Sequence, residues 1–343
     1  MVLKTYPNKN LYDVLKALFG TVIAKGIILL YAIWAYLFVI VKVGAYSVTL
    51  QATLMPSIHP GILITILFLL VIYTLTKNTR TIFRFAEFLY QPILVFLAIM
   101  FLFALPNMDF YELVPVSISN LEENLYTVPD ICSIGGNLVL VLFFSKKLIY
   151  SGNMKNITKR VLNTVVVFSI ISILSIVLSV AINGATITSK LSYPMFQAIK
   201  NVSILNTFER FDSLMTMIAV LSDFVGIYIF LQMIMLCLGW IFSYQSNEEN
   251  DVYHVNTDSH VMNNSLKVYG AVLFFIACVY ILLRNITQYE FETYYREIQV
   301  YLNIIFQFVV PILLGVICLV KQLGRRRREY RMEQSSMTTD VDV

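Results

Sequence analysis

The sequence predicts an all-α fold, a polytopic bundle of transmembrane helices, and three observations support that class. Eight long apolar segments run through the 343 residues, and stretches of roughly 17–25 apolar residues are long enough to span a bilayer. Hydrophobic residues make up 58% of the chain and charged residues only 13%, whereas soluble proteins carry about 25% charged residues. The loops also alternate between rich and poor in Lys and Arg, as expected of loops on opposite sides of a membrane.

The apolar runs give the following elements in chain order. Asn10–Phe19 has the spacing of an amphipathic helix lying at the membrane interface and running on into the first span. Residues 1–324 are expected to form a single transmembrane domain, and the basic, then polar, tail 325–343 is expected to be disordered and cytoplasmic. We place the eight spans at Gly20–Val43, Pro60–Thr76, Phe83–Leu105, Ile131–Phe144, Val161–Ala181, Phe211–Phe242, Val268–Leu283 and Ile298–Val320.

Loop charge predicts the orientation of the chain, because Lys and Arg near span ends tend to stay cytoplasmic. Of the 25 Lys and Arg residues, 18 fall in the termini and in alternate loops, 6 fall on the other side, and Lys25 lies inside the first span. Lys42 is counted among the 6, at the outer end of the first span. Eight spans with both termini cytoplasmic satisfy this asymmetry.

The fourth span differs from the others. It opens with Pro129 and Asp130 and is interrupted by Ser133, Gly135, Gly136 and Asn137. Each glycine costs a helix roughly 1 kcal/mol relative to alanine, and freed backbone groups survive in a bilayer only beside a cavity or a protein partner. Broken spans of this kind form the substrate sites of secondary transporters. The alternative is that the glycines permit close helix packing, and the sequence leaves both interpretations open.

Ionisable residues inside spans are functional candidates because they are costly in hydrocarbon. Lys25 lies one turn inside the first span, where its amine can extend to the membrane surface. Asp223 lies near the middle of the sixth span, too deep to reach water unless it faces a cavity or a partner. A ligand role and a buried structural role are both open for Asp223.

The sequence offers little support for other classes of function. No phosphate-binding loop, nucleophile elbow, zinc-protease motif or dinucleotide motif is present, so we expect no enzyme. The four cysteines are single and in apolar segments, which argues against a zinc site. We expect no metal, no cofactor and no nucleic-acid partner.

Several short motifs give the chain a close resemblance to the B subunits of spore germinant receptors, the endospore germination permease family of the amino acid/polyamine/organocation transporter superfamily. The motifs are the Tyr6-Pro7-Asn8 start with Tyr12 and Gly20, Pro106-Asn107-Met108-Asp109 with Leu113 and Pro115, Gly135-Gly136, and Leu191-Ser192-Tyr193-Pro194 followed by Phe208-Glu209-Arg210-Phe211-Asp212. The resemblance covers nearly the whole chain.

The resemblance implies a LeuT-like fold of two inverted five-helix repeats, in which the first span of each repeat is broken and helps to form the ligand site. Here the broken span is the fourth. Three spans would therefore belong to the first repeat and five, from about residue 129, to the second, so we expect the first two family spans to be absent.

The resemblance also implies a function. Family members act in the inner spore membrane with an A subunit and a C lipoprotein, and they sense small nutrients such as amino acids or sugars to trigger germination. The expected ligand site comprises Ser133, Gly135, Gly136, Asn137 and Asp223. The alternatives are a proton- or sodium-coupled amino acid permease and a scaffold subunit that binds no ligand.

Overall fold

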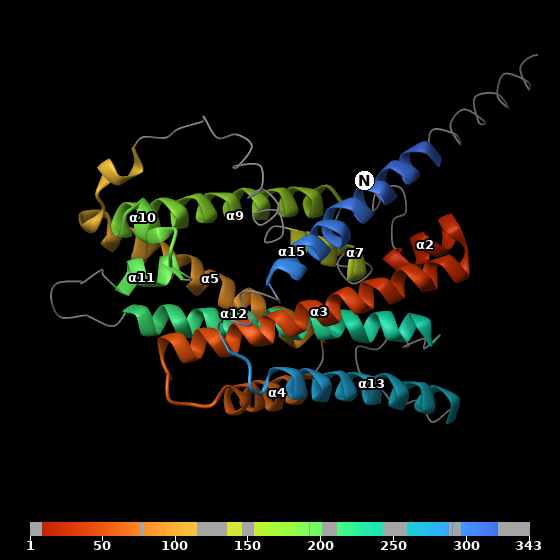
Figure 1. Cartoon of the computed structure of the whole chain (residues 1–343). Coiled ribbons are helices and arrows are strands. Elements are labelled where there is room, and N and C mark those ends of the chain that lie inside the picture. The colour runs from red at the N-terminus through yellow and green to blue at the C-terminus, as the bar shows by residue number, and fades with distance from the viewer. Residues whose placement is uncertain are drawn as a thin grey trace, which may run out of the picture.

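The computed structural model describes residues 9–75, 79–114, 136–145, 154–191, 193–200, 211–242, 259–287, 290 and 296–321. The described residues form helices and contain no strand. The predicted all-α polytopic bundle is therefore confirmed as a fold class. Figure 1 shows the helices arranged around a central pair, α3 and α12.

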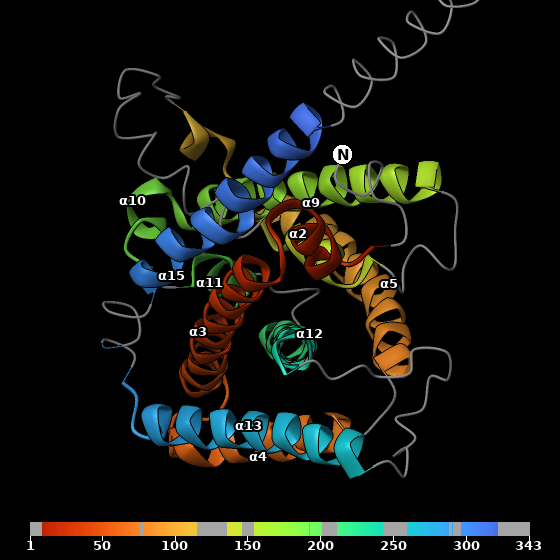
Figure 2. The same ribbon diagram turned by 90° about the vertical axis from the view of Figure 1, so that its right-hand side faces the viewer.

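Helices α3 (Thr21–Thr53) and α12 (Phe211–Ile241) make the most extensive helix contact in the described chain. They run antiparallel, because Lys25 near the start of α3 donates to the carbonyl of Ile241 at the end of α12, at 2.9 Å. At 1.5 Å per residue the two helices are about 50 and 46 Å long, which exceeds the roughly 30 Å of a hydrocarbon core. Figure 2, which views α12 end-on, places it between α3 and α5.

The structure corrects the end of the first span. The predicted span ended at Val43, but α3 continues for ten further residues to Thr53. The apolar run continues past Lys42, and the next residue that opposes a helix is Pro56, which disfavours helical backbone before it. Lys42 was predicted at the outer end of the first span, and it lies well inside α3, which ends at Thr53.

Helices α4 (Pro60–Leu75) and α13 (Ser259–Leu283) pack side by side below the central pair (Figures 1 and 2). Their contact is close where Gly61 meets the end of α13, because a Cβ on Gly61 would lie 3.3 Å from the carbonyl oxygen of Arg284. The His59 ring accepts a hydrogen bond from the Gly61 amide and caps the start of α4. Helices α3 and α12 thus pair with each other, as do the helices that follow them, α4 and α13.

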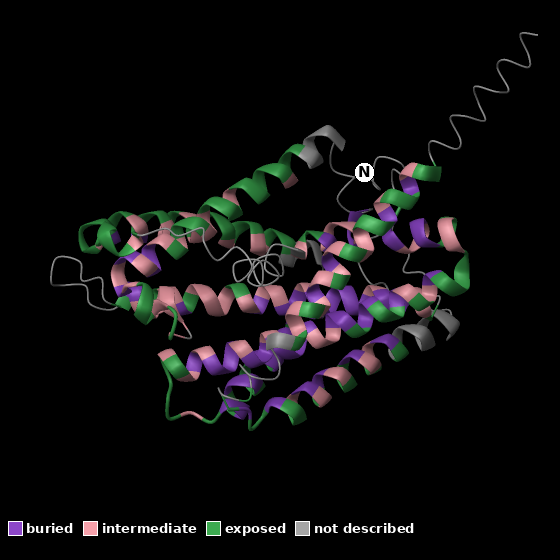
Figure 3. Ribbon diagram, turned by 45° about the horizontal axis from the view of Figure 1, so that its top comes forward, coloured by how far each residue is buried: buried purple, intermediate pink, exposed green. Residues whose placement is uncertain are grey.

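Helices α5 (Thr79–Ala104) and α9 (Met154–Asn183) lie on the other side of the centre. They are joined where the Asp109 amide donates to the Ala181 carbonyl, at 2.9 Å. Four short helices complete this end: η1 (Leu105–Asn107), η2 (Phe110–Leu113), α10 (Ala185–Thr188) and α11 (Pro194–Lys200). The central helices are largely buried, whereas the apolar faces of α5 and α9 are mostly exposed (Figure 3), as expected where lipid or a partner covers them.

Five described helices are long and apolar enough to cross a membrane: α3, α5, α9, α12 and the last span, Ile298–Lys321. Two more, α4 and α13, are shorter apolar helices that match the predicted second and seventh spans. The predicted fourth span, Ile131–Phe144, lies partly outside the described residues. Its described part is the 3₁₀ turn η3 (Gly136–Val139) and the single turn α7 (Leu140–Phe143). Eight full spans are thus not established.

Three hydrogen bonds join chain segments that lie at one end of the bundle. Lys321 donates to the Ala17 carbonyl, Ser145 donates to the Lys9 carbonyl, and Lys25 donates to Ile241. The chain segments predicted to reach the cytoplasmic side therefore meet at the same end. The amphipathic helix forms as predicted (α2, Leu11–Phe19), but Gly20, at φ 84°, separates it from α3 and its apolar residues are buried against the bundle.

Candidate ligand site

The last span contains a local break in its helical pattern. It begins as α15 (Arg296–Asn303), widens into the π-helix η5 (Ile304–Val309), and continues as an α-helix to residue 321. Insertions of π-helix occur frequently at functional sites, because they shift the backbone out of the regular ladder. Here the Phe306 carbonyl accepts a hydrogen bond from the Tyr31 hydroxyl at 3.0 Å, which ties the π-helix to α3.

Two further hydrogen bonds link this π-helical region to its neighbours. The Trp34 indole donates to the Asn303 side-chain oxygen at 2.9 Å. The Gln307 amide nitrogen donates to the Asn137 side-chain oxygen at 3.1 Å. The polar groups of the interrupted fourth segment, the π-helix and α3 therefore form one cluster inside the bundle, which we call the Gln307 cluster: Tyr31, Trp34, Asn137, Asn303 and Gln307.

The Gln307 side chain is only partly satisfied. It is 5% exposed, and its amide oxygen has no hydrogen-bond partner among the residues that the structure describes. Leaving a buried polar group unpaired costs about 1–3 kcal/mol, and such groups are rare in native proteins. The Gln307 oxygen is an acceptor placed to take a hydrogen bond from a donor that enters the cluster.

Aromatic rings surround the polar cluster. Tyr31 makes edge contacts with Phe143 and Phe306, at centroid distances of 5.2 Å each. Phe230 of α12 stacks on Phe38 at 3.8 Å and meets Trp34 edge-on at 5.6 Å. These rings keep water from the polar groups and fix the orientation of the side chains that carry them.

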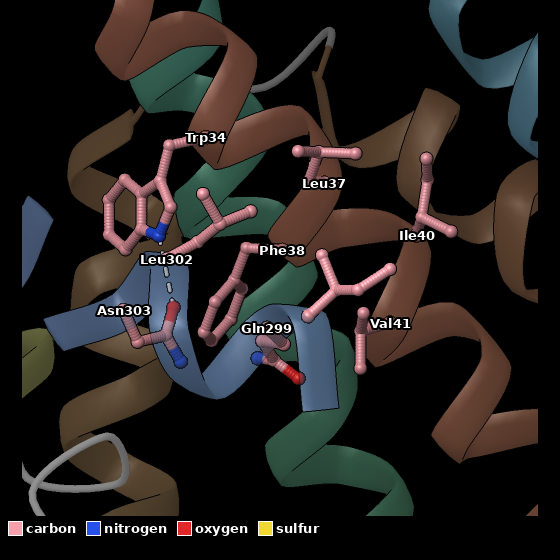
Figure 4. Close-up of a pocket in the computed structure, with 9 residues that line it drawn as sticks. Trp34, Leu37, Phe38, Ile40, Val41, Gln299, Leu302 and Asn303 are labelled. Atoms are coloured by element: carbon pink, nitrogen blue, oxygen red, sulfur yellow. Dashed lines mark hydrogen bonds between the residues drawn. The ribbon is translucent and has the colours of Figure 1, made fainter. Parts of the chain in front are cut away.

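A cavity of about 120 Å³ lies beside this cluster, between α3 and α15. Its wall is almost entirely apolar, and Figure 4 shows the Trp34 indole directed at Asn303 along the edge of the cavity. A wall of this kind suits an apolar group with one polar end. The lining residues are Trp34, Leu37, Phe38, Ile40, Val41, Ile298, Gln299, Leu302 and Asn303.

The sequence-predicted site residues fall into three groups. Ser133 and Gly135 lie outside the described residues. Gly136 opens the 3₁₀ turn η3, and Asn137 joins the Gln307 cluster. Asp223 lies elsewhere: no hydrogen bond or ion pair between described residues connects it to Asn137. The expectation of irregular backbone here holds in part, since Gly136 and Asn137 are in a 3₁₀ turn and not in an α-helix.

Asp223 forms an ion pair with Lys42, with the Lys42 Nζ atom 3.1 Å from Oδ1. The two side chains are 36% and 20% exposed, so both reach a surface of the described chain. The Tyr46 phenol, one turn after Lys42 on α3, lies within electrostatic range of the Asp223 carboxylate. Asp223, near the middle of α12, is therefore paired with a lysine on the facing helix.

Sequence reasoning missed several of these residues. Lys42 was missed because the first span was ended one residue after it, although the helix continues for ten residues beyond Val43. Asn303 and Gln307 are two amides spaced i, i+4 inside the apolar last span. That spacing places both on one face of a helix, and polar residues in a span would have identified them as candidates.

The bond between Tyr31 and the π-helix gives a testable prediction. Tyr31→Phe removes the hydroxyl that satisfies the partly buried Phe306 carbonyl, so we expect a loss of about 1–3 kcal/mol in stability at most, measured by thermal unfolding in detergent. Tyr36→Phe on the same helix is the control and should have little effect, because its hydroxyl makes no hydrogen bond with any described residue and its ring packs on Phe275. Equal effects of both substitutions would contradict this role for Tyr31.

Comparison with known proteins identifies the family of the chain. Residues 1–286 match the model of a protein family described as spore germination protein. No curated protein and no solved structure shows significant similarity to the chain. The match covers most of the sequence and includes α3, α12 and Asn137, so this membrane-embedded helical bundle is a member of the spore germination permease family.

Proposed function

We propose that the chain is the permease-like membrane subunit of a spore nutrient germinant receptor, and that a small nutrient such as an amino acid or a sugar binds at the Gln307 cluster. Membership of the germination family gives the process. One observation supports the binding role, namely that the buried Gln307 oxygen, opposite the interrupted fourth segment, has no partner in the described part of the chain. A nutrient that donates to this oxygen would satisfy it. Ser133, Gly135 and Gly136 belong to the same proposed site.

The helix pairing supports a transporter-like inverted-repeat architecture for this proposal. The long helices α3 and α12 run antiparallel, and the helices after them, α4 and α13, also pack together. Two repeats of opposite orientation would place corresponding helices side by side in this way. We therefore assign α3 to α5 to the first repeat and the chain from about residue 129 to the second, within one transmembrane domain, 1–324, followed by the tail 325–343.

Ligand binding would act by shifting the bundle between two states. A ligand can favour one state only if its affinity for the two states differs. The π-helix η5 is placed to provide that difference, because it carries Gln307 and bonds to both α3 and the fourth segment. A receptor A subunit and a C lipoprotein in the spore inner membrane would then respond to the favoured state.

An ion-coupled amino acid permease is the second candidate, and the Lys42–Asp223 pair is the observation that favours it. Ionisable pairs inside membranes occur in proton and ion pathways. Uptake of labelled amino acid into proteoliposomes, dependent on a proton or sodium gradient, would identify a permease. Ligand binding without uptake is expected of a receptor, and a scaffold subunit would show neither.

The double variant Asn137→Leu/Gln307→Leu tests the binding role. Both partners of the hydrogen bond are removed together, so we expect stability to change by less than about 1 kcal/mol while nutrient-triggered germination is lost. Release of spore contents on nutrient addition measures the response, and protein abundance in the spore membrane is the control. A normal dose response with normal abundance would contradict a ligand site at Gln307.

The proposed orientation has both termini and the end marked by Ala17, Ser145, Ile241 and Lys321 in the cytoplasm, following the positive-inside rule. Single cysteines in place of Tyr111, which is 88% exposed, and of Lys159 mark opposite ends in a chain whose four native cysteines are replaced by alanine. We expect an impermeant thiol reagent to label position 111 and not 159 in intact cells. The reverse labelling would invert the proposed topology.

A further inference from the structure

A second polar site lies away from the Gln307 cluster. The Lys42–Asp223 ion pair joins the two central helices at 3.1 Å. Lys42 is eight residues beyond Trp34 on α3, which places it about 12 Å further along the helix, toward the end of the bundle opposite Lys25. A small solute could not reach both positions at once. We propose that the Lys42–Asp223 pair is a separate binding site for a zwitterionic solute, with Lys42 binding the carboxylate and Asp223 the ammonium group.

The exposure of the pair makes it accessible to a solute. Lys42 and Asp223 retain 36% and 20% exposure, although both lie within helices that are otherwise largely buried. A pair that served only to join α3 to α12 could be replaced by apolar side chains with little loss of stability or a gain. A pair that reaches a surface can exchange its internal partner for an external one without unfolding either helix.

The charges of the pair select the class of solute. Separating Lys42 from Asp223 in an apolar environment leaves two unpaired charges, which is costly. A neutral sugar offsets neither charge, and a simple anion or cation offsets only one. A zwitterion supplies a carboxylate for Lys42 and an ammonium for Asp223, so the site remains paired and its net charge is unchanged. Rejection of analogues that lack one group follows, because one charge of the pair would be left without a partner.

The surroundings of the pair suit such a solute. Tyr46, one turn beyond Lys42, is the further polar group within range of the Asp223 carboxylate. Phe38, one turn before Lys42, forms part of the wall of the apolar cavity of about 120 Å³. An apolar side chain on the solute therefore has space within one helical turn of the charges. The Lys42–Asp223 site adds a second binding position to the proposed function. Substitutions can test it separately from the Gln307 cluster.

The test uses the purified full chain in detergent and the shift in melting temperature with added solute. The probes are the twenty L-amino acids, the methyl ester and the N-acetyl derivative of each amino acid that binds, and D-glucose. Because a charge-assisted hydrogen bond is worth about tenfold or more in affinity, we expect the ester and the N-acetyl derivative to bind at least about tenfold more weakly than the parent amino acid.

Substitutions then test which charge of the pair binds which group of the solute. Lys42→Met should lower the affinity for the parent amino acid to that for its methyl ester, and Asp223→Asn should lower it to that for the N-acetyl derivative. Lys25→Met is the matched control, since Lys25 donates to a backbone carbonyl on the same pair of helices, and it should keep the full discrimination.

A double variant separates a loss of binding from a loss of folding. Lys42→Met/Asp223→Leu leaves no unpaired charge, so it should fold and lose the discrimination among the three forms of the solute. The inference is overturned if no L-amino acid binds, if the derivatives bind as well as the parent, or if the folded double variant still discriminates. Binding of glucose alone would overturn this inference and leave the proposed nutrient-binding function intact.

Discussion

The antiparallel contact between α3 and α12, the most extensive in the described chain, positions the other helices of the bundle. It brings Lys42 to Asp223 and Lys25 to Ile241, and it sets Phe230 against Phe38 and Trp34. Hydrocarbon offers no hydrogen bonds to a polar side chain, so each polar group on these helices must find a protein partner or a water-filled path. Both proposed binding positions arise from this requirement.

The two irregular segments of the bundle form a hydrogen bond with each other. The interrupted fourth segment presents Asn137, and the π-helix of the last span presents Gln307, so that two departures from regular helix meet in one hydrogen bond. Tyr31 on α3 bonds to the same π-helix through a backbone carbonyl. Helix α3 therefore connects the Gln307 cluster, near its middle, to the Lys42–Asp223 pair further along. A shift of α3 against the last span would affect both positions together.

The sequence predicted the fold class and most of the helices because long apolar runs have few alternatives in a membrane. It did not predict the partner of Asp223. Lys42 and Asp223 are 181 residues apart in the sequence, so their pairing depends on how α3 and α12 pack. The predicted first span also ended at Val43, whereas the helix ends at Thr53. The π-helix leaves no clear signal in an apolar segment, although Asn303 and Gln307 mark its position. Ser133 and Gly135 lie outside the described residues, so their place in the site rests on Asn137 beside them.

A charge exchange between α3 and α12 tests directly whether Lys42 pairs with Asp223 and so joins the two central helices. The measurement is the yield of monodisperse protein extracted from membranes for Lys42→Asp, Asp223→Lys and the combined variant. Each single substitution places two like charges together inside the bundle, so we expect a severe loss of yield for both. The combined variant restores opposite charges and should recover most of the yield. Tolerance of both single substitutions, or no recovery in the combined variant, would contradict the pairing of Lys42 with Asp223.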